Sequence, residues 1–153
     1  MVRVMATGVF DLLHVGHLHY LRQARELGDE LVVIIARDSR VREMKHEPIV
    51  SEEQRREMVE ALKPVDRALL GHQEDIYRSV ERVRPDVIAL GWDQDFDAQE
   101  IETECRGRGV DVEVVRLEKM EGDLQGTTKL IQRVVSLWPF PQEVGPAPKE
   151  EVP

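Results

Sequence analysis

Two histidines, His14 and His17, stand three positions apart with Gly16 between them. The apolar run at residues 2–7 predicts a strand, and a helix is expected to begin near Gly16. The N-terminus of a helix presents unpaired backbone N–H groups and the positive end of the helix dipole, so it favours a bound phosphate. Because side chains three residues apart lie on one helix face, both imidazoles are predicted to contact one polyphosphate.

A simpler role for these histidines is that of helix caps or surface groups, the common role of a single histidine near a helix start. A pair that brackets a glycine and follows Gly-x-Phe-Asp after a strand favours a functional site instead. A zinc site made by His14, His17 and His19 is another interpretation. It is weak, because the sole cysteine, Cys105, is distant in the sequence and the spacing differs from that of zinc-binding helices.

Residues 8–17 resemble the first signature of the small nucleotidyltransferases of the cytidylyltransferase-like superfamily, which includes glycerol-3-phosphate cytidylyltransferase. A closer resemblance, to the archaeal FAD synthases, rests on residues 28–31, 35–38, 48–66 and 86–91. The likeness covers roughly residues 2–135. It implies that a phosphate oxygen of an acceptor attacks the α-phosphorus of a nucleoside triphosphate and that pyrophosphate leaves. Such a site must hold two phosphates in line and stabilise the charge that develops on them.

The resemblance also implies roles for individual residues. The catalytic set would be His14, His17 and Lys45, with Lys45 on a loop that reaches the phosphates. The nucleotide would be bound by these histidines together with Gly8, Val9, Phe10, Gly91, Asp93, Lys119, Thr127 and Thr128. The acceptor substrate would be bound by Asp11, Asp38, Arg55 and Trp92. Simpler structural roles stay open for most of them: a solvated lysine, a turn or helix cap, an exposed helix partner, a packed tryptophan.

The substrates that the resemblance implies are ATP and FMN, with FAD and pyrophosphate as products. Mg²⁺ or another divalent cation would be held mainly by the triphosphate rather than by protein ligands. Cytidylyl or adenylyl transfer, from CTP or ATP, to glycerol 3-phosphate or another small phosphate ester is the alternative. A nucleotide-binding regulator without catalysis is a third hypothesis, which the two histidines and the lysine-bearing loop disfavour. A homodimer is expected from the resemblance alone.

Strands and helices are expected to alternate along the chain, which is typical of an α/β doubly wound parallel sheet with helices on both faces. Strands are predicted at residues 2–7, 31–36, 68–70, 87–90 and 112–117. Helices are predicted at residues 16–27, 51–62, 74–83, 97–106 and 128–137, with an irregular stretch at 37–50. The resemblance implies the strand order 3-2-1-4-5. Ligands bind where such an order reverses, beside residues 8–17 and 91–95.

Hydrophobic periodicity predicts which faces of two helices turn inward. The inward residues are expected to be Met58, Ala61 and Leu62 in one helix, and Leu130, Ile131, Val134 and Val135 in the last. A cap for that last helix is expected from Thr127 or Thr128.

Length and composition bound the remaining possibilities. With 153 residues, the chain is expected to hold one nucleotidyltransferase domain at residues 1–137 and a flexible, proline-rich acidic tail at 138–153, its start pinned by Trp138 and Phe140. The net charge of −9 disfavours nucleic-acid and anionic-membrane partners. Together with the length of 153 residues, it leaves no room for the tRNA-binding module of an aminoacyl-tRNA synthetase, which has a similar histidine signature. No apolar run is long enough to suggest a membrane span or signal peptide, and one cysteine fits the cytoplasm.

Overall fold

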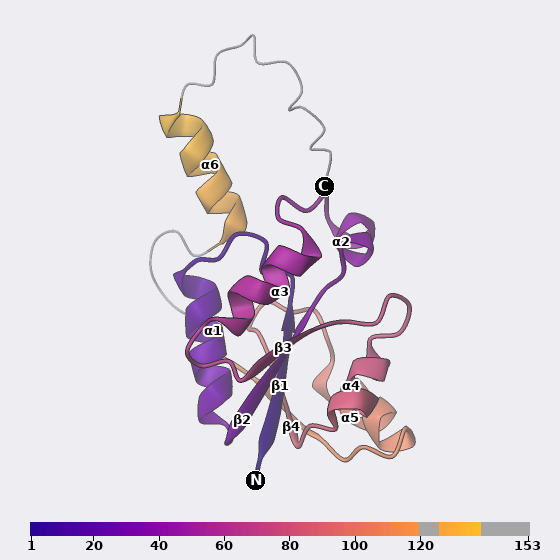
Figure 1. Cartoon of the computed structure of the whole chain (residues 1–153). Coiled ribbons are helices and arrows are strands. Elements are labelled where there is room, and N and C mark those ends of the chain that lie inside the picture. Colours follow the sequence, from indigo (N-terminus) through magenta and orange to yellow (C-terminus); the bar gives the residue numbers. More distant parts are fainter. Residues whose placement is uncertain (120–125, 139–153) are drawn as a thin grey trace.

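The computed structural model describes residues 1–119 and 126–138 (Figure 1). In these residues a parallel sheet has the strand order β3-β2-β1-β4-β5. The strands are β1 (Arg3–Gly8), β2 (Glu30–Ile35), β3 (Arg67–Leu70), β4 (Val87–Leu90) and β5 (Glu113–Arg116). The helices are α1 (Val15–Glu26), α2 (Asp38–Met44), α3 (Glu52–Glu60), α4 (Tyr77–Val83), α5 (Ala98–Gly107) and α6 (Thr127–Leu137). The predicted doubly wound sheet and its strand order are confirmed.

Two apolar clusters, one on each face, hold the sheet between helices. Leu21 and Ala24 of α1 and Val59 of α3 belong to one cluster, and α4 and α5 contribute residues such as Val80 and Ile101 to the other. Successive residues of β2 alternate between the two clusters, so this strand is covered on both faces, as its β-branched run predicts. Burying one such side chain contributes roughly 1.5–3 kcal/mol.

The irregular stretch predicted at residues 37–50 is wrong in part, because the helix α2 occupies Asp38–Met44. The next helix begins where expected, after Ser51, whose Oγ accepts a hydrogen bond from the Gln54 N–H at 3.4 Å. Its inward face differs from the prediction: Arg55 and Val59 are buried, while Met58 is 56% exposed. Ala61 is also exposed, and Leu62 is half-buried against the core. A buried arginine sets this face, and apolar periodicity does not reveal such a residue.

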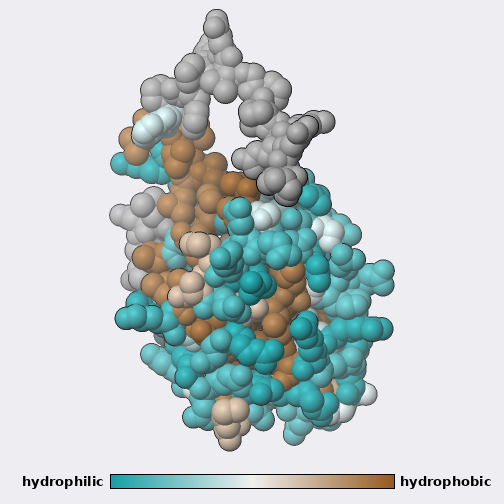
Figure 2. Space-filling view, in the orientation of Figure 1, coloured by the Kyte–Doolittle hydropathy of each residue, from teal (hydrophilic) through white to brown (hydrophobic). Residues whose placement is uncertain are grey.

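The inward face predicted for α6 is also wrong. None of its residues is buried, and Val134 and Val135 are 52% and 64% exposed. The helix extends from one corner of the sheet instead of lying on it, and Figure 2 shows apolar surface along it. Leu130 and Ile131 are only half-buried. Its N-cap is Gly126, which offers no side chain, rather than a threonine.

Two expectations about the end of the chain have different outcomes. Trp138 is 68% exposed, so it does not anchor the tail to the domain. Phe140 and the predicted tail beyond it lie outside the described residues. Within the part of the chain that is described, no helix has both the length and the apolar character needed to cross a membrane.

Gly8 ends β1 under the ring of Phe10, and we predict that an added side chain there destabilises the fold. A Cβ at Gly8 would lie 2.7 Å from Cε2 of Phe10, whose ring is buried and whose backbone is left-handed (φ 55°). Gly8→Ala should therefore destabilise the fold by about 1–3 kcal/mol through overpacking, measured by urea unfolding. Gly107→Ala is the control, because no atom lies within 4 Å of its added Cβ. Equal stability of the two variants would contradict the prediction.

Candidate active site

A cavity of about 1020 Å³ opens at the carboxyl ends of the strands. It lies beside β1 and β4, where the strand order reverses, which is the position that binds ligands in open α/β sheets. Its walls come from residues 8–17, the C-terminal part of α2, the segment after β3, the loop after β4 and the start of α6.

The cavity brings together most of the residues predicted from the sequence. Those that line it are Gly8, Val9, Phe10, Asp11, His14, His17, Lys45, Gly91, Trp92, Asp93, Thr127 and Thr128. Three predicted residues are not in its wall: Asp38, Arg55 and Lys119.

His14 and His17 cap α1 with their own side chains. Nδ1 of His14 accepts a hydrogen bond from the Gly16 N–H at 3.0 Å, and Nδ1 of His17 accepts one from the His14 N–H at 3.3 Å. This is a capping box in which imidazoles replace the usual hydroxyl and carboxylate. The helix-cap role and the functional role predicted for these histidines are therefore compatible.

The capping geometry sets the tautomer of both rings. A neutral imidazole has one acceptor and one donor nitrogen, so an accepting Nδ1 assigns the proton to Nε2. The two rings stack with their centroids 3.8 Å apart. They thus form a paired N–H donor group that needs no positive charge, beside the free amides of a helix N-terminus.

Burial keeps these rings neutral. It lowers the pKa of His14, and it is the main cause that lowers the pKa of His17 to about 4, with smaller effects from the positive charges of a protonated His14 and of Lys45. An unfolded histidine binds its proton near pH 6.5. As the pH falls from about 6.5 to about 4, the unfolded state takes up the proton first, so the folded state should lose stability.

We expect this loss to reach about 3 kcal/mol at most for His17. The measurement is the unfolding free energy of the ligand-free protein at several pH values between 6.5 and 4, compared with His17→Asn. Asparagine retains an acceptor for the cap but does not titrate, so the variant should lose less stability over this interval. Parallel pH profiles for the two proteins would show that His17 is not the titrating group.

Asp11 ties the histidine loop to the segment that precedes α3. Its carboxylate accepts hydrogen bonds from the Ile49 N–H at 3.0 Å and from the Val50 N–H at 2.8 Å. Only 6% of Asp11 is exposed. Because Lys45 lies a few residues before Ile49, this contact limits where the lysine-bearing loop can move.

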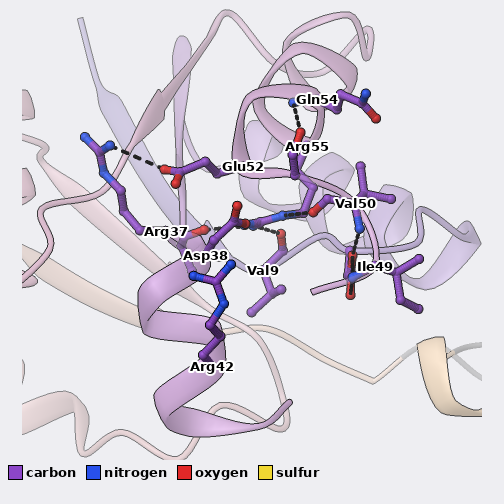
Figure 3. Close-up of polar contacts among 12 residues, drawn as sticks. Val9, Arg37, Asp38, Arg42, Ile49, Val50, Glu52, Gln54 and Arg55 are labelled. Atoms are coloured by element: carbon purple, nitrogen blue, oxygen red, sulfur yellow. Dashed lines mark hydrogen bonds and ion pairs between the residues drawn. The ribbon is translucent and has the colours of Figure 1, made fainter. Parts of the chain in front are cut away.

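Arg55 also connects the histidine loop to the segment that precedes α3 (Figure 3). Its guanidinium donates to the carbonyls of Val9 and Ala36, both at 2.8 Å, and of Val50 at 2.9 Å. It also forms an ion pair with Asp38 at 2.6 Å, and its side chain has no exposed surface. The substrate contacts predicted for Arg55 and Asp38 are therefore corrected to a supporting role: they join the end of β1, the end of β2 and the start of α3.

The loop after β4 is held by residues that the sequence analysis did not select. Oε1 of Gln94 accepts from the Gly91 N–H at 2.8 Å, and Nε2 of Gln94 donates to the Thr7 carbonyl at 3.2 Å. Arg116 donates to the carbonyls of Gly91, Gln94 and Phe96 at 3.2, 2.8 and 2.5 Å. For Arg116, the sequence offered one indication of such a role, a cation placed at the carboxyl end of a predicted strand.

Tyr20 joins the two strands at the reversal point, and it was also missed. Its hydroxyl donates to the Ala89 carbonyl at 2.7 Å and accepts from the Thr7 N–H at 3.3 Å. Burial raises the pKa of this hydroxyl far above its usual range, so it acts as a permanent donor. The tyrosine thereby holds α1, which carries the histidines, against β1 and β4.

Trp92 and Lys119 meet at the edge of the cavity. Nζ of Lys119 lies 4.7 Å from the centroid of the Trp92 ring, within range of a cation–π interaction. Trp92 is 50% exposed, so it is not a core residue. Its exposed ring is available to stack on a planar ligand.

The described residues of the cavity offer no cluster of side chains that could enclose a metal ion. Among residues 1–119 and 126–138 no group of three or more His, Cys, Asp or Glu side chains is arranged to hold one, so the zinc interpretation has no support there. Mg²⁺ prefers oxygen ligands and commonly uses substrate phosphates with few protein groups. A Mg²⁺ ion that arrives on a triphosphate would not require such a group.

Comparisons with known proteins identify the family of the chain. A family model described as cytidylyltransferase-like matches residues 5–143. The FAD synthase of Aciduliprofundum boonei is 64% identical over 136 residues, covering 88% of this chain and 91% of that protein. The FAD synthase of Ferroglobus placidus is 51% identical over 138 residues, covering 90% of each.

A solved structure is similar throughout its length. The lipopolysaccharide core biosynthesis protein from Thermoplasma volcanium GSS1 is 50% identical with a TM-score of 0.77, and the match covers 79% of this chain and 99% of that one. Together with the family model and the two FAD synthases, these matches show that the chain belongs to the cytidylyltransferase-like family, among the FAD synthases, and is a nucleotidyltransferase.

Proposed function

We propose that the chain transfers AMP from ATP to FMN, forming FAD and releasing pyrophosphate. The observation that carries the proposal is the stacked His14–His17 pair, which caps α1 at the point where the strand order of the sheet reverses. The relatives named FAD synthase, which match most of the chain, support FMN as the acceptor.

In this mechanism the protein positions phosphates and stabilises their charge. The Nε2–H groups of His14 and His17, with the backbone of Gly8, Val9 and Phe10, would hold the triphosphate. A phosphate oxygen of FMN attacks the α-phosphorus of ATP, the bond from that phosphorus to the bridging oxygen breaks, and pyrophosphate takes the electron pair.

Further residues would bind the two ends of the donor nucleotide. Lys45 and Lys119 supply positive charge, and Thr127 and Thr128 supply hydroxyls for the phosphates at the start of α6. The nucleoside would lie against the loop after β4, in contact with Gly91, Asp93 and the ring of Trp92. Asp11 would act through the loop that it holds. Mg²⁺, carried by the triphosphate oxygens, would neutralise the leaving pyrophosphate.

The test is a matrix of donors and acceptors with the purified chain. ATP and CTP are each combined with FMN and with glycerol 3-phosphate in the presence of Mg²⁺, and both pyrophosphate and the dinucleotide product are quantified. We expect FAD from ATP plus FMN as the preferred product. Pyrophosphate release with glycerol 3-phosphate but not with FMN would reject the proposal in favour of the alternative acceptor.

The proposal includes a cytoplasmic homodimer without nucleic-acid or membrane partners. The exposed apolar residues of α6 support association, because a monomer gains nothing by exposing such a face. The buried free thiol of Cys105 suits a reducing compartment, and the net charge of −9 repels polyanions. Light scattering after size-exclusion chromatography would measure the mass in solution.

A further inference from the structure

The segment after β3 forms a wall of the cavity that the proposed reaction leaves unassigned. Gly71, His72, Ile76 and Tyr77 all line the cavity. The nucleotide is proposed to occupy the histidine loop and the loop after β4, on the opposite side of β1 from this wall. The inference below rests on the proposed function and concerns the part of the acceptor that contacts this wall.

The register of the sheet places this wall level with the histidine loop. Gly8 of β1 pairs with Ile35 of β2, and Ile35 pairs with Leu70 of β3. The two loops therefore leave the sheet at the same height, separated by two strand spacings, or roughly 10 Å. An acceptor whose phosphate lies at the histidine loop needs a spacer to reach the wall.

His72 resembles His14 and His17 in its hydrogen bonding, because backbone N–H groups occupy its Nδ1 atom. Its Nδ1 accepts hydrogen bonds from the N–H groups of Glu74 and Asp75, at 3.2 and 3.1 Å. Within the described residues the hydrogen bonds of this ring involve Nδ1 alone. The neutral ring therefore carries its proton on Nε2, which is left for a ligand in the cavity.

Neighbouring contacts hold the wall in place. The Arg37 Nε–H donates to the Gly71 carbonyl at 2.9 Å, and the Tyr77 N–H donates to Asp75 at 2.9 Å. Arg108 binds the same Asp75 carboxylate at 2.8 Å and lies 5.2 Å from the centroid of the Tyr77 ring. These contacts fix the turn that carries the His72 donor and the Tyr77 ring.

Ile76 adds an apolar surface beside them. It is 41% exposed, although it precedes a helix whose own apolar residues, such as Val80, are buried. A polar donor next to aliphatic and aromatic surface suits a planar heteroaromatic ring with acceptor atoms at its edge. FMN has such a ring, and a five-carbon ribityl chain separates it from the phosphate.

We propose that this wall binds the isoalloxazine ring of FMN, with His72 donating from Nε2 to an acceptor atom of the ring. Ile76 and Tyr77 pack against the ring. The wall thereby distinguishes a flavin phosphate from short phosphate esters such as glycerol 3-phosphate, which end before they reach it.

Asparagine at position 72 separates the two roles of the histidine. Its side-chain oxygen corresponds to Nδ1 and can still accept from the turn amides, but it has nothing at the position of Nε2. We expect His72→Asn to raise the KM for FMN about tenfold, the effect of one lost hydrogen bond. The KM for ATP should stay within twofold, and the melting temperature should not change. His72→Ala should raise the KM for FMN similarly and also lower the melting temperature.

The apolar part of the wall has its own matched pair of variants. Ile76→Ala should raise the KM for FMN several-fold, whereas Met58→Ala, at another exposed apolar position outside the cavity, should not. Binding of FMN alone, followed by flavin fluorescence, should weaken in the same order as the KM values.

The outcomes separate this inference from the function on which it rests. If the wild-type chain makes FAD and His72→Asn leaves the KM for FMN unchanged, His72 is only a turn cap and the inference is wrong. If the KM for ATP rises instead, the wall belongs to the nucleotide. If the wild-type chain makes no FAD from ATP and FMN, the proposed function itself fails and the assignment of the ring fails with it.

Discussion

His17→Ala is expected to lower kcat/KM for FAD formation about 100- to 1000-fold. Removing one hydrogen-bond donor that stabilises the charge developing on the transferred phosphate lowers the rate by this amount. The alanine variant loses both the Nε2–H donor and the acceptor that caps α1 at the His14 N–H. Its activity and its unfolding free energy are measured together, because the lost cap alone should cost only about 1 kcal/mol.

Two further variants isolate the role of the donor. His17→Asn keeps a cap acceptor, so it should retain stability and still lose most of its activity. Arg22→Ala, at an exposed position on the same helix outside the cavity wall, should change kcat/KM by no more than a few-fold. Full activity in His17→Asn would show that the ring serves α1 and not the phosphates.

Arg55→Ala is expected to destabilise the protein by roughly 3–5 kcal/mol, as removal of one member of a buried ion pair does. The change leaves the Val9, Ala36 and Val50 carbonyls without their donor, and it removes the partner of Asp38. Urea unfolding measures the loss. In the molecules that still fold, activity should also fall, because Val9 belongs to the backbone proposed to bind the phosphates.

The neighbouring arginine provides the control. Arg56 forms a partly exposed ion pair with Glu60 at 3.2 Å, so Arg56→Ala should cost less than about 1 kcal/mol. The loss of stability in Arg55→Lys should lie between those of Arg55→Ala and Arg56→Ala, since an ammonium cannot reproduce the four contacts made by a planar guanidinium. If Arg55→Ala were no less stable than Arg56→Ala, the buried network would not be a major source of stability.

Much of the fold follows from local patterns. The β-branched run in β2 is buried on both faces, and its burial predicts a parallel sheet. The glycine and histidine spacing before α1 predicts a helix N-terminus at a strand end, and the cavity opens there. Both signals are short in range, so the sequence shows them directly. The strand order came from the resemblance to a family and not from the residues.

The supporting residues were harder to predict for a physical reason. Arg55, Arg116 and Gln94 bind backbone carbonyls and amides that only the folded chain brings together. A sequence shows a cation but not its acceptors, so Arg55 was assigned to the substrate. The prediction that the apolar face of α6 is buried was wrong for a different reason. The periodicity of its sequence indicates an apolar stripe but not whether another surface is present to cover it.

The positions of the two tryptophans, Trp92 and Trp138, give the molecule an optical property. Both indoles face water, at 50% and 68% exposure, so intrinsic emission should be red-shifted even in the native state. Only Trp92 borders the cavity. Trp138→Phe would therefore leave a single tryptophan beside the loop where the nucleoside is proposed to bind, and quenching of its emission would report binding of the donor nucleotide without any attached dye.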